Sequence, residues 1–162
     1  MIVGISTTKS AVIVAVTRGA AEKFVLTNLR PISFQVRSGA DLTELLHKLH
    51  VLFAPQSRCA GATIALLKCS SGRFGSCLEA IKAEAMVELA ATQHGLGIVK
   101  VPPQSLKKAL GGPPEQKWRE RALELFNRDG KRRHWSKGAA GAVAVAFKVA
   151  ADSSLQSRGR AT

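Results

Sequence analysis

Acidic residues are scarce in this sequence. Asp and Glu number 11 against 24 Lys and Arg in 162 residues, which gives a formal net charge of +13 at pH 7. Such an excess of positive charge attracts polyanions and speeds encounter with them. Nucleic acid is therefore the expected partner. The alternatives are a basic composition that serves solubility, or a place in a large ribonucleoprotein.

Cysteine is also scarce, with Cys59, Cys69 and Cys77 as the whole set. The number is odd and no C-x-x-C pair occurs, which argues against a disulfide framework and a zinc site. We expect free thiols in a reducing cytoplasm. His47 and His50 are spaced i, i+3 on a predicted helix, but no third ligand is evident nearby. We therefore expect packing or surface histidines, and neither a metal nor a cofactor.

Long hydrophobic runs are missing as well. No uninterrupted apolar run reaches 18 residues, which predicts no membrane span. The apolar N-terminal stretch has no basic region ahead of it, so we expect a strand there and not a signal peptide. Hydrophobic residues make up 46% of the chain, which is enough for a core, and the length suits one domain.

The hydrophobic pattern predicts an α/β protein. Three β-branched segments with short links predict an antiparallel meander, and later strands that alternate with helices should run parallel. The expected fold is a mixed five-stranded sheet flanked by helices, in residues 1–151, followed by a disordered basic tail in 152–162. The expected strands are 2–6, 11–17, 23–28, 62–67 and 97–101, and the expected helices are 41–54, with Asp41 as N-cap, 77–95, 104–110, 115–130 and 136–151.

This element order, with VGIS in the first strand, resembles the ribonuclease H-like fold and within it the RuvC-like Holliday-junction resolvases. A related group of small bacterial and phage proteins of unknown function is similar in the middle of the chain. Residues 72–112 carry the best part of the likeness, because a loop and long helix lead into a strand, the segment Pro103–Lys107 and a Gly-Gly turn. The resemblance implies a cytoplasmic protein, with the nucleoid or a phage-infected cell as alternative settings.

The resemblance also implies where a nuclease site would lie. In this family four acids hold two Mg²⁺ ions, which clamp the attacking and leaving oxygens of a phosphodiester. The four matching positions here are Ser6, Leu67, Gly138 and Gly141, and none is acidic. A shift of the alignment restores little, since no acid lies between Glu44 and Glu79 or between Asp129 and Asp152. We expect no enzyme activity.

A basic stretch precedes the last predicted helix. Residues 128–137 hold five Lys or Arg around a Trp, a combination that suits phosphate contact and base stacking. The alternative is a solvated loop whose Trp is anchored in the core. In resolvase-like folds Arg73 and the pair Lys107 and Lys108 lie on the same face as this stretch, and Lys9 on the first hairpin could join them. The predicted nucleic-acid-binding residues are therefore Lys9, Arg73, Lys107, Lys108, Arg128, Lys131, Arg132, Arg133, Trp135 and Lys137.

Two further features concern the helix at 77–95. Glu79, Glu84 and Glu88 form an acidic stripe, for which surface ion pairs are the ordinary interpretation and residual metal binding the alternative. Its small apolar face, Ala83, Ala85, Ala90 and Ala91, would permit close helix packing in a homodimer, as the resemblance implies.

Three functions follow from these observations. The first is a catalytically inactive RuvC-like protein that binds structured or branched DNA or RNA. The second is a scaffold subunit of a larger protein or ribonucleoprotein assembly. The third is a metal-dependent nuclease whose site is rebuilt or completed by a partner.

Overall fold

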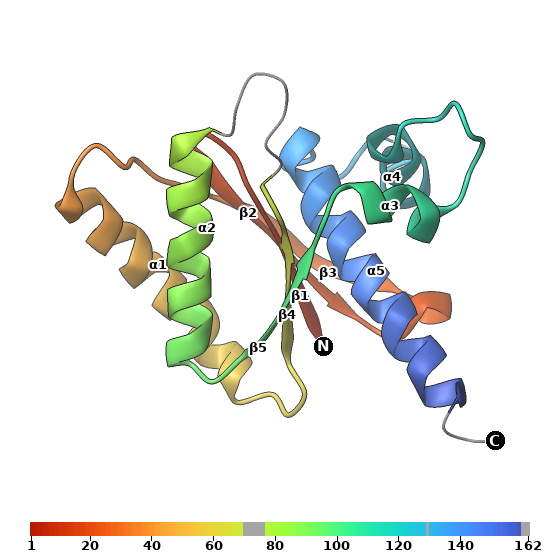
Figure 1. Cartoon of the computed structure of the whole chain (residues 1–162), viewed down its shortest axis with the longest axis horizontal. Helices are drawn as coiled ribbons and strands as arrows, with labels where there is room; N and C mark the ends of the chain where they lie inside the picture. The colour runs from red at the N-terminus through yellow and green to blue at the C-terminus, as the bar shows by residue number, and fades with distance from the viewer. Residues whose placement is uncertain (70–76, 129, 160–162) are drawn as a thin grey trace.

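A computed structural model of the chain describes residues 1–69, 77–128 and 130–159 (Figure 1). It has a five-stranded mixed sheet in the order β3-β2-β1-β4-β5. The first three strands pair antiparallel, whereas β4 runs parallel to β1, and β5 runs parallel to β4. The predicted sheet is confirmed. The strands are β1 (Ile2–Thr7), β2 (Ala11–Arg18), β3 (Val25–Ser33), β4 (Thr63–Leu67) and β5 (Gly97–Val101).

Helices cover both faces of this sheet. One face carries two helices that run side by side in the same direction, and a single long helix crosses the other face with two short helices beside its start (Figure 1). The pair is α1 (Gly39–Ser57) and α2 (Leu78–Gln93), the long helix is α5 (Lys137–Gly159), the short helices are α3 (Gln104–Leu110) and α4 (Trp118–Phe126), and a 3-10 turn, η1, spans Ala21–Lys23.

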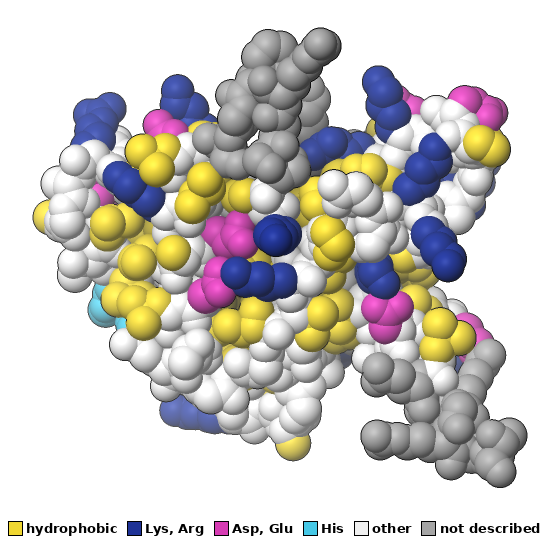
Figure 2. All heavy atoms as spheres, in the orientation of Figure 1, with side chains coloured by type: hydrophobic (Ala, Val, Ile, Leu, Met, Phe, Trp, Pro, Cys, Tyr) yellow, Lys and Arg dark blue, Asp and Glu magenta, His cyan; other side chains and the backbone are white. Residues whose placement is uncertain are grey.

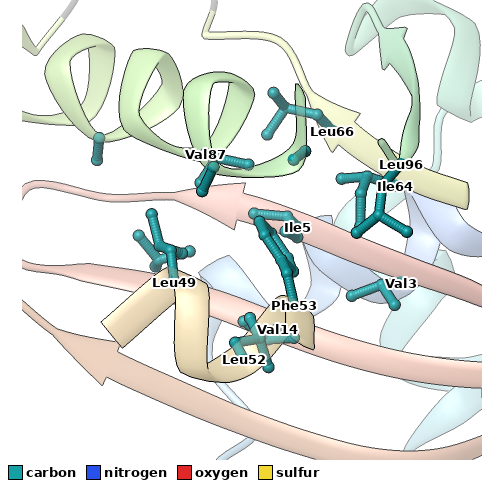
Figure 3. Packing of buried hydrophobic residues seen from close by; sticks show 14 of the residues in the cluster. Val3, Ile5, Val14, Leu49, Leu52, Phe53, Ile64, Leu66, Val87 and Leu96 are labelled. Atoms are coloured by element: carbon teal, nitrogen blue, oxygen red, sulfur yellow. The ribbon is translucent and has the colours of Figure 1, made fainter. Parts of the chain in front are cut away.

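The main core lies between the sheet and the helices α1 and α2. Alternate residues of the inner strands, such as Val3 and Ile5, point to this face and pack around Phe53 of α1 and Val87 of α2 (Figure 3). These side chains are fully buried. Because burial of one such side chain stabilises a fold by about 1.5–3 kcal/mol, this layer fixes the register of the sheet.

The other face packs against α5 through small residues. Gly4 of β1 lies directly under the helix, because a Cβ atom there would overlap the carbonyl oxygen of Ala142 and lie 2.8 Å from the Cβ of Ala146. Ala139 and Ala142 of α5 are fully buried against Ala15. The start of α5 is thereby held close to the carboxyl ends of β1 and β4.

Two element boundaries differ from those predicted. The third strand runs to Ser33 and not to residue 28, and it tolerates Pro31 because β3 is an edge strand whose outer side needs no ladder partner. Helix α1 begins before Asp41, because Ser38 is its N-cap and Asp41 is the reciprocal member of a capping box.

The C-terminal segment is a second correction. Helix α5 continues to Gly159, so residues 152–159 are helical where the sequence predicted a disordered tail. Lys148 pairs with Asp152 at 2.7 Å, one turn apart. The hydroxyl groups of Ser153 and Ser154 donate to the carbonyl oxygens of Val149 and Ala150. The ion pair favours helix in this segment, where the serines have a low intrinsic helix propensity. The tail predicted for residues 160–162 lies outside the described residues.

The same helix passes a composition test for a membrane span. The window Gly138–Leu155 is long enough and has a mean hydropathy high enough to cross a membrane, although it contains no uninterrupted apolar run of 18 residues. Of this window 56% is buried inside the protein, and α5 packs against β1, β2 and β4. The apolar character of α5 is therefore that of a helix packed against the core of the fold.

Candidate nucleic-acid interface

The four positions that the sequence assigned to missing acids lie together at one end of the sheet. Ser6 ends β1, Leu67 ends β4, and Gly138 and Gly141 lie in the first turns of α5. The Ser6 hydroxyl donates a hydrogen bond to the carbonyl oxygen of Gly138 at 2.5 Å. A Cβ atom on Gly141 would lie 2.9 Å from Cδ2 of Leu67 and 3.2 Å from Cβ of Ser6.

The two glycines of α5 have a packing role. Each glycine inside a helix costs about 1 kcal/mol relative to alanine, so their presence needs a cause. At Gly138 a Cβ atom would lie 2.8 Å from Cγ1 of Ile13 and 3.1 Å from Cγ2 of Thr8. Any side chain at these two positions, a carboxylate included, therefore needs the neighbours to move. The glycines let α5 approach the strands more closely than other residues allow.

These residues do not fit a pair of Mg²⁺ ions. Mg²⁺ needs oxygen ligands with negative charge, whereas Leu67 is apolar and the Ser6 hydroxyl is used by Gly138. Within the described parts of the chain, no group of three or more His, Cys, Asp or Glu could hold a metal ion. These residues therefore support no metal-dependent step at this site.

A cleft of about 940 Å³ opens above these residues. Ser6, Thr7 and Leu67 line it from the strands, and Gly138 from α5. Trp118 and Leu123 of α4 line a second side, and Trp135 lines it from the segment before α5. The charged side chains that line it are Lys107, Lys117, Arg119, Glu115 and Glu120. We call this hollow the tryptophan cleft.

Several contacts hold the charged groups of the tryptophan cleft. The guanidinium of Arg119 lies 4.3 Å from the ring centroid of Trp118 in a cation–π contact. The Glu120 carboxylate accepts from the backbone N–H of Lys117 at 3.4 Å. The ammonium of Lys107 donates to the carbonyl oxygen of Pro114. Figure 2 shows Lys and Arg side chains gathered over α3 and α4, with acidic side chains at the outer edge.

A second hollow, of about 450 Å³, lies over the edge strand β3. Arg30 and its neighbours in β3 form one side, and Arg132, Arg133 and His134 form the other. The Arg132 side chain donates to the carbonyl oxygen of Phe126, so its charge is held at the end of α4. We call this the arginine hollow.

The predicted basic residues are divided among these places. Lys107 and Trp135 line the tryptophan cleft, whereas Arg132 and Arg133 line the arginine hollow. The division has a cause, since Trp135 packs into the core and separates the residues before it from those after it. Lys9 lines a third hollow with Arg37 and Glu79.

The remaining predicted residues have no common site. Lys108, Arg128 and Lys131 are exposed. Arg73 and the side chain of Lys137 lie outside the described residues. Sequence reasoning also missed Trp118 and the flanking Lys117 and Arg119, although the run Lys-Trp-Arg combines charge with an aromatic ring as the selected loop does. Their role in binding stays a prediction.

The acidic stripe of α2 forms a structural network. Glu84 is buried and accepts from the backbone N–H of Cys69 at 2.9 Å, and Lys100 of β5 lies 2.6 Å from Glu88 and 3.7 Å from Glu84. The hydrogen bond to Glu88 raises the pKa of Lys100. Burial raises the pKa of the Cys69 thiol to about 11, so this thiol stays protonated at neutral pH. These ion pairs tie α2 to β5.

The histidines pair differently from the spacing considered in the sequence. Nδ1 of His50 lies 3.0 Å from Nε2 of His94, which follows α2, and His47 is exposed. The pair joins α1 to the end of α2 beside the ring of Phe53. Its geometry is that of a hydrogen bond between two partly buried rings, so His50 is a packing histidine, whereas His47 lies at the surface.

The sheet order and the helix placement match the RuvC-like form of the ribonuclease H-like fold. A structure of Thermus thermophilus RuvC in complex with a Holliday junction substrate superimposes with a TM-score of 0.68 at 16% identity, over 91% of this chain and 90% of that chain. A second T. thermophilus RuvC structure gives 0.65 at 18% identity, with the same coverage. No protein-family profile and no curated protein sequence matches this chain. The similarity is therefore one of fold.

Proposed function

We propose that this protein is a catalytically inactive RuvC-like protein that binds structured or branched nucleic acid. One observation carries the proposal: the four positions where the family holds its acids meet in space, and they are filled by a serine, a leucine and two glycines. Four carboxylates there would repel a phosphate backbone, and this chain carries a net charge of +13 instead. The protein can then hold a junction without cutting it.

Recognition should depend on shape more than on sequence. The exposed cations of α3 and α4 reach phosphates, which carry no sequence information. The similarity to RuvC in complex with a Holliday junction supports a branched ligand. We place this activity in the cytoplasm, where the nucleoid or phage DNA supplies branched substrates.

A binding panel tests this function. Four-way-junction DNA, duplex DNA, single-stranded DNA and structured RNA are compared at two salt concentrations by fluorescence anisotropy. We expect the junction or structured RNA to bind most tightly, and every affinity to fall as salt rises. Failure to bind any of them would favour the scaffold function, in which the charge serves docking to a larger assembly.

Helix α2 supports a homodimer in a way that the sequence did not predict. Of its small residues, Ala83, Ala90 and Ala91 are buried within the chain against the core, so they are not free for a partner, whereas Ala85 is exposed. Its exposed side chains include Leu78, Ile81 and Leu89 instead. We propose that this apolar stripe pairs with its copy in a second chain.

The dimer predicts a specific effect of one charge. Leu89 is 40% exposed. The variant Leu89→Glu should give a monomer mass by light scattering, because its charge would be buried between the two chains of a dimer. Val51→Glu on α1, where the valine is 64% exposed, is the matched control and should leave the mass unchanged. A monomer mass for the unmodified protein at micromolar concentration would refute the dimer.

A further inference from the structure

The tryptophan cleft lies over Ser6, Leu67 and Gly138, three of the positions that the resemblance assigns to a nuclease site. We propose that it takes one unstacked nucleobase of the bound nucleic acid, an inference that rests on the proposed function. The base would lie against the indole rings, and the flanking phosphates would lie outside against the exposed cations. The cleft thus becomes a site for a base where the family has a site for the scissile phosphate.

The walls of the cleft supply flat aromatic surface. The chain has two tryptophans, Trp118 and Trp135, and both line this cleft. Each ring is partly buried against the core and partly open to the cleft, so its position is fixed before a ligand arrives. Stacking on such a ring is tolerant of base identity, because every base has a π face. Preorganised rings lower the entropy cost of binding.

The charges around the cleft favour a base inside it over a phosphate. Three cations, Lys107, Lys117 and Arg119, line the cleft with two carboxylates, Glu115 and Glu120. Because these charges nearly balance, the inside of the cleft attracts a phosphate only weakly. An uncharged planar base does not depend on a net charge for binding there. Arg119 already stacks on Trp118, which extends the aromatic platform with a cation suited to a neighbouring phosphate. A volume of about 940 Å³ leaves ample room for one base.

The hydroxyl groups at the floor are already bonded. Ser6 donates to Gly138, Thr7 lies 3.3 Å from the sulfur of Cys69, and Thr8 donates to Ala11. They therefore offer little for reading the edge of a base. The cleft should accept any base that can leave its stack, and junction centres and single strands are where such bases occur at least cost.

Intrinsic fluorescence tests the inference directly. The chain has no tyrosine, so selective excitation of tryptophan reports on Trp118 and Trp135 alone. A single-stranded oligonucleotide is compared with an abasic strand of the same length and phosphate number, and binding is followed independently by anisotropy of a terminal dye. We expect the base-bearing strand to quench the tryptophans and to bind about five- to a hundredfold more tightly than the abasic strand.

A variant assigns the effect to one ring. Trp118→Leu should lower affinity for the base-bearing strand toward that of the abasic strand and leave abasic binding unchanged, and Trp118→Phe should restore part of the difference. If Trp118→Leu does not fold, the comparison of base-bearing and abasic strands on the unmodified protein still tests the inference. Equal affinity and equal fluorescence with both strands would overturn the base site while the proposed function stands. Absent binding of both strands would overturn this inference, and absent binding of a four-way junction and of structured RNA as well would overturn the proposed function with it.

Discussion

Replacing Gly4 with alanine should lower the free energy of unfolding by about 3 kcal/mol, at the upper end of ordinary overpacking penalties. The new methyl group would occupy the space of the Ala142 carbonyl oxygen and lie 2.8 Å from the Cβ of Ala146. The obstacle is helix backbone, so rotation of a side chain cannot relieve it. The start of α5 must move away from β1 and carry Gly138 with it. Urea unfolding followed by circular dichroism measures the change.

A glycine in another strand provides the control for Gly4. Gly97 begins β5, and a Cβ atom there meets nothing within 4 Å. Gly97→Ala should be neutral or should stabilise the protein by about 0.5–1 kcal/mol, since alanine has fewer unfolded conformations to lose. Equal stability of Gly4→Ala and the unmodified protein would show that α5 does not lie so close to the sheet.

Removing two cations beside the tryptophan cleft should weaken nucleic-acid binding about thirtyfold at low salt. Lys117 and Arg119 line the cleft with exposed side chains, and each contact with a phosphate contributes about 1 kcal/mol in water. Replacing both with glutamine should also lower the slope of log affinity against log salt concentration by about two. Anisotropy titrations with a four-way junction at several salt concentrations measure both quantities.

Two cations on the far side of the sheet provide the comparison. Lys48 lies in α1 and Arg58 is its C-cap, on the face of the sheet opposite α5. Replacing both removes the same total charge at a distance from the cleft. Their double replacement with glutamine should leave the salt slope unchanged. Equal effects of the two double variants would mean that net charge alone attracts the ligand, and that the cleft is not the binding face.

The strands and the convergence of their ends were predictable because they follow from local patterns. Apolar, β-branched runs identify buried strands, and the order of elements fixes which ends meet. Ser6, Leu67 and Gly141 therefore come together as the sequence indicated. Helix α5 extends beyond its predicted end because its last turns rely on side-chain bonds such as that of Lys148 to Asp152, which a hydropathy pattern does not capture.

The cleft itself was not predictable from the sequence. Its walls come from α4 and from the segment before α5, and their separation depends on how Trp118 and Trp135 pack against a common core. The same packing places Lys107 and Arg132 in different hollows, whereas the sequence predicted one common binding face for both. Tertiary packing of this kind has no local signal. The role of α2 changed for a similar reason, because Ala83 and Ala90 face inward, whereas Leu78 and Leu89 are exposed.

Loss of cleavage with retention of binding is the central claim, and one experiment tests both. A labelled four-way junction is saturated with protein in the presence of Mg²⁺ or Mn²⁺, and the same samples are run on a native gel and a denaturing gel. We expect a shifted complex on the native gel and intact strands on the denaturing gel, for the unmodified protein and for Ser6→Asp, which supplies one ligand of four. Metal-dependent strand breaks that co-purify with the unmodified protein would contradict the claim.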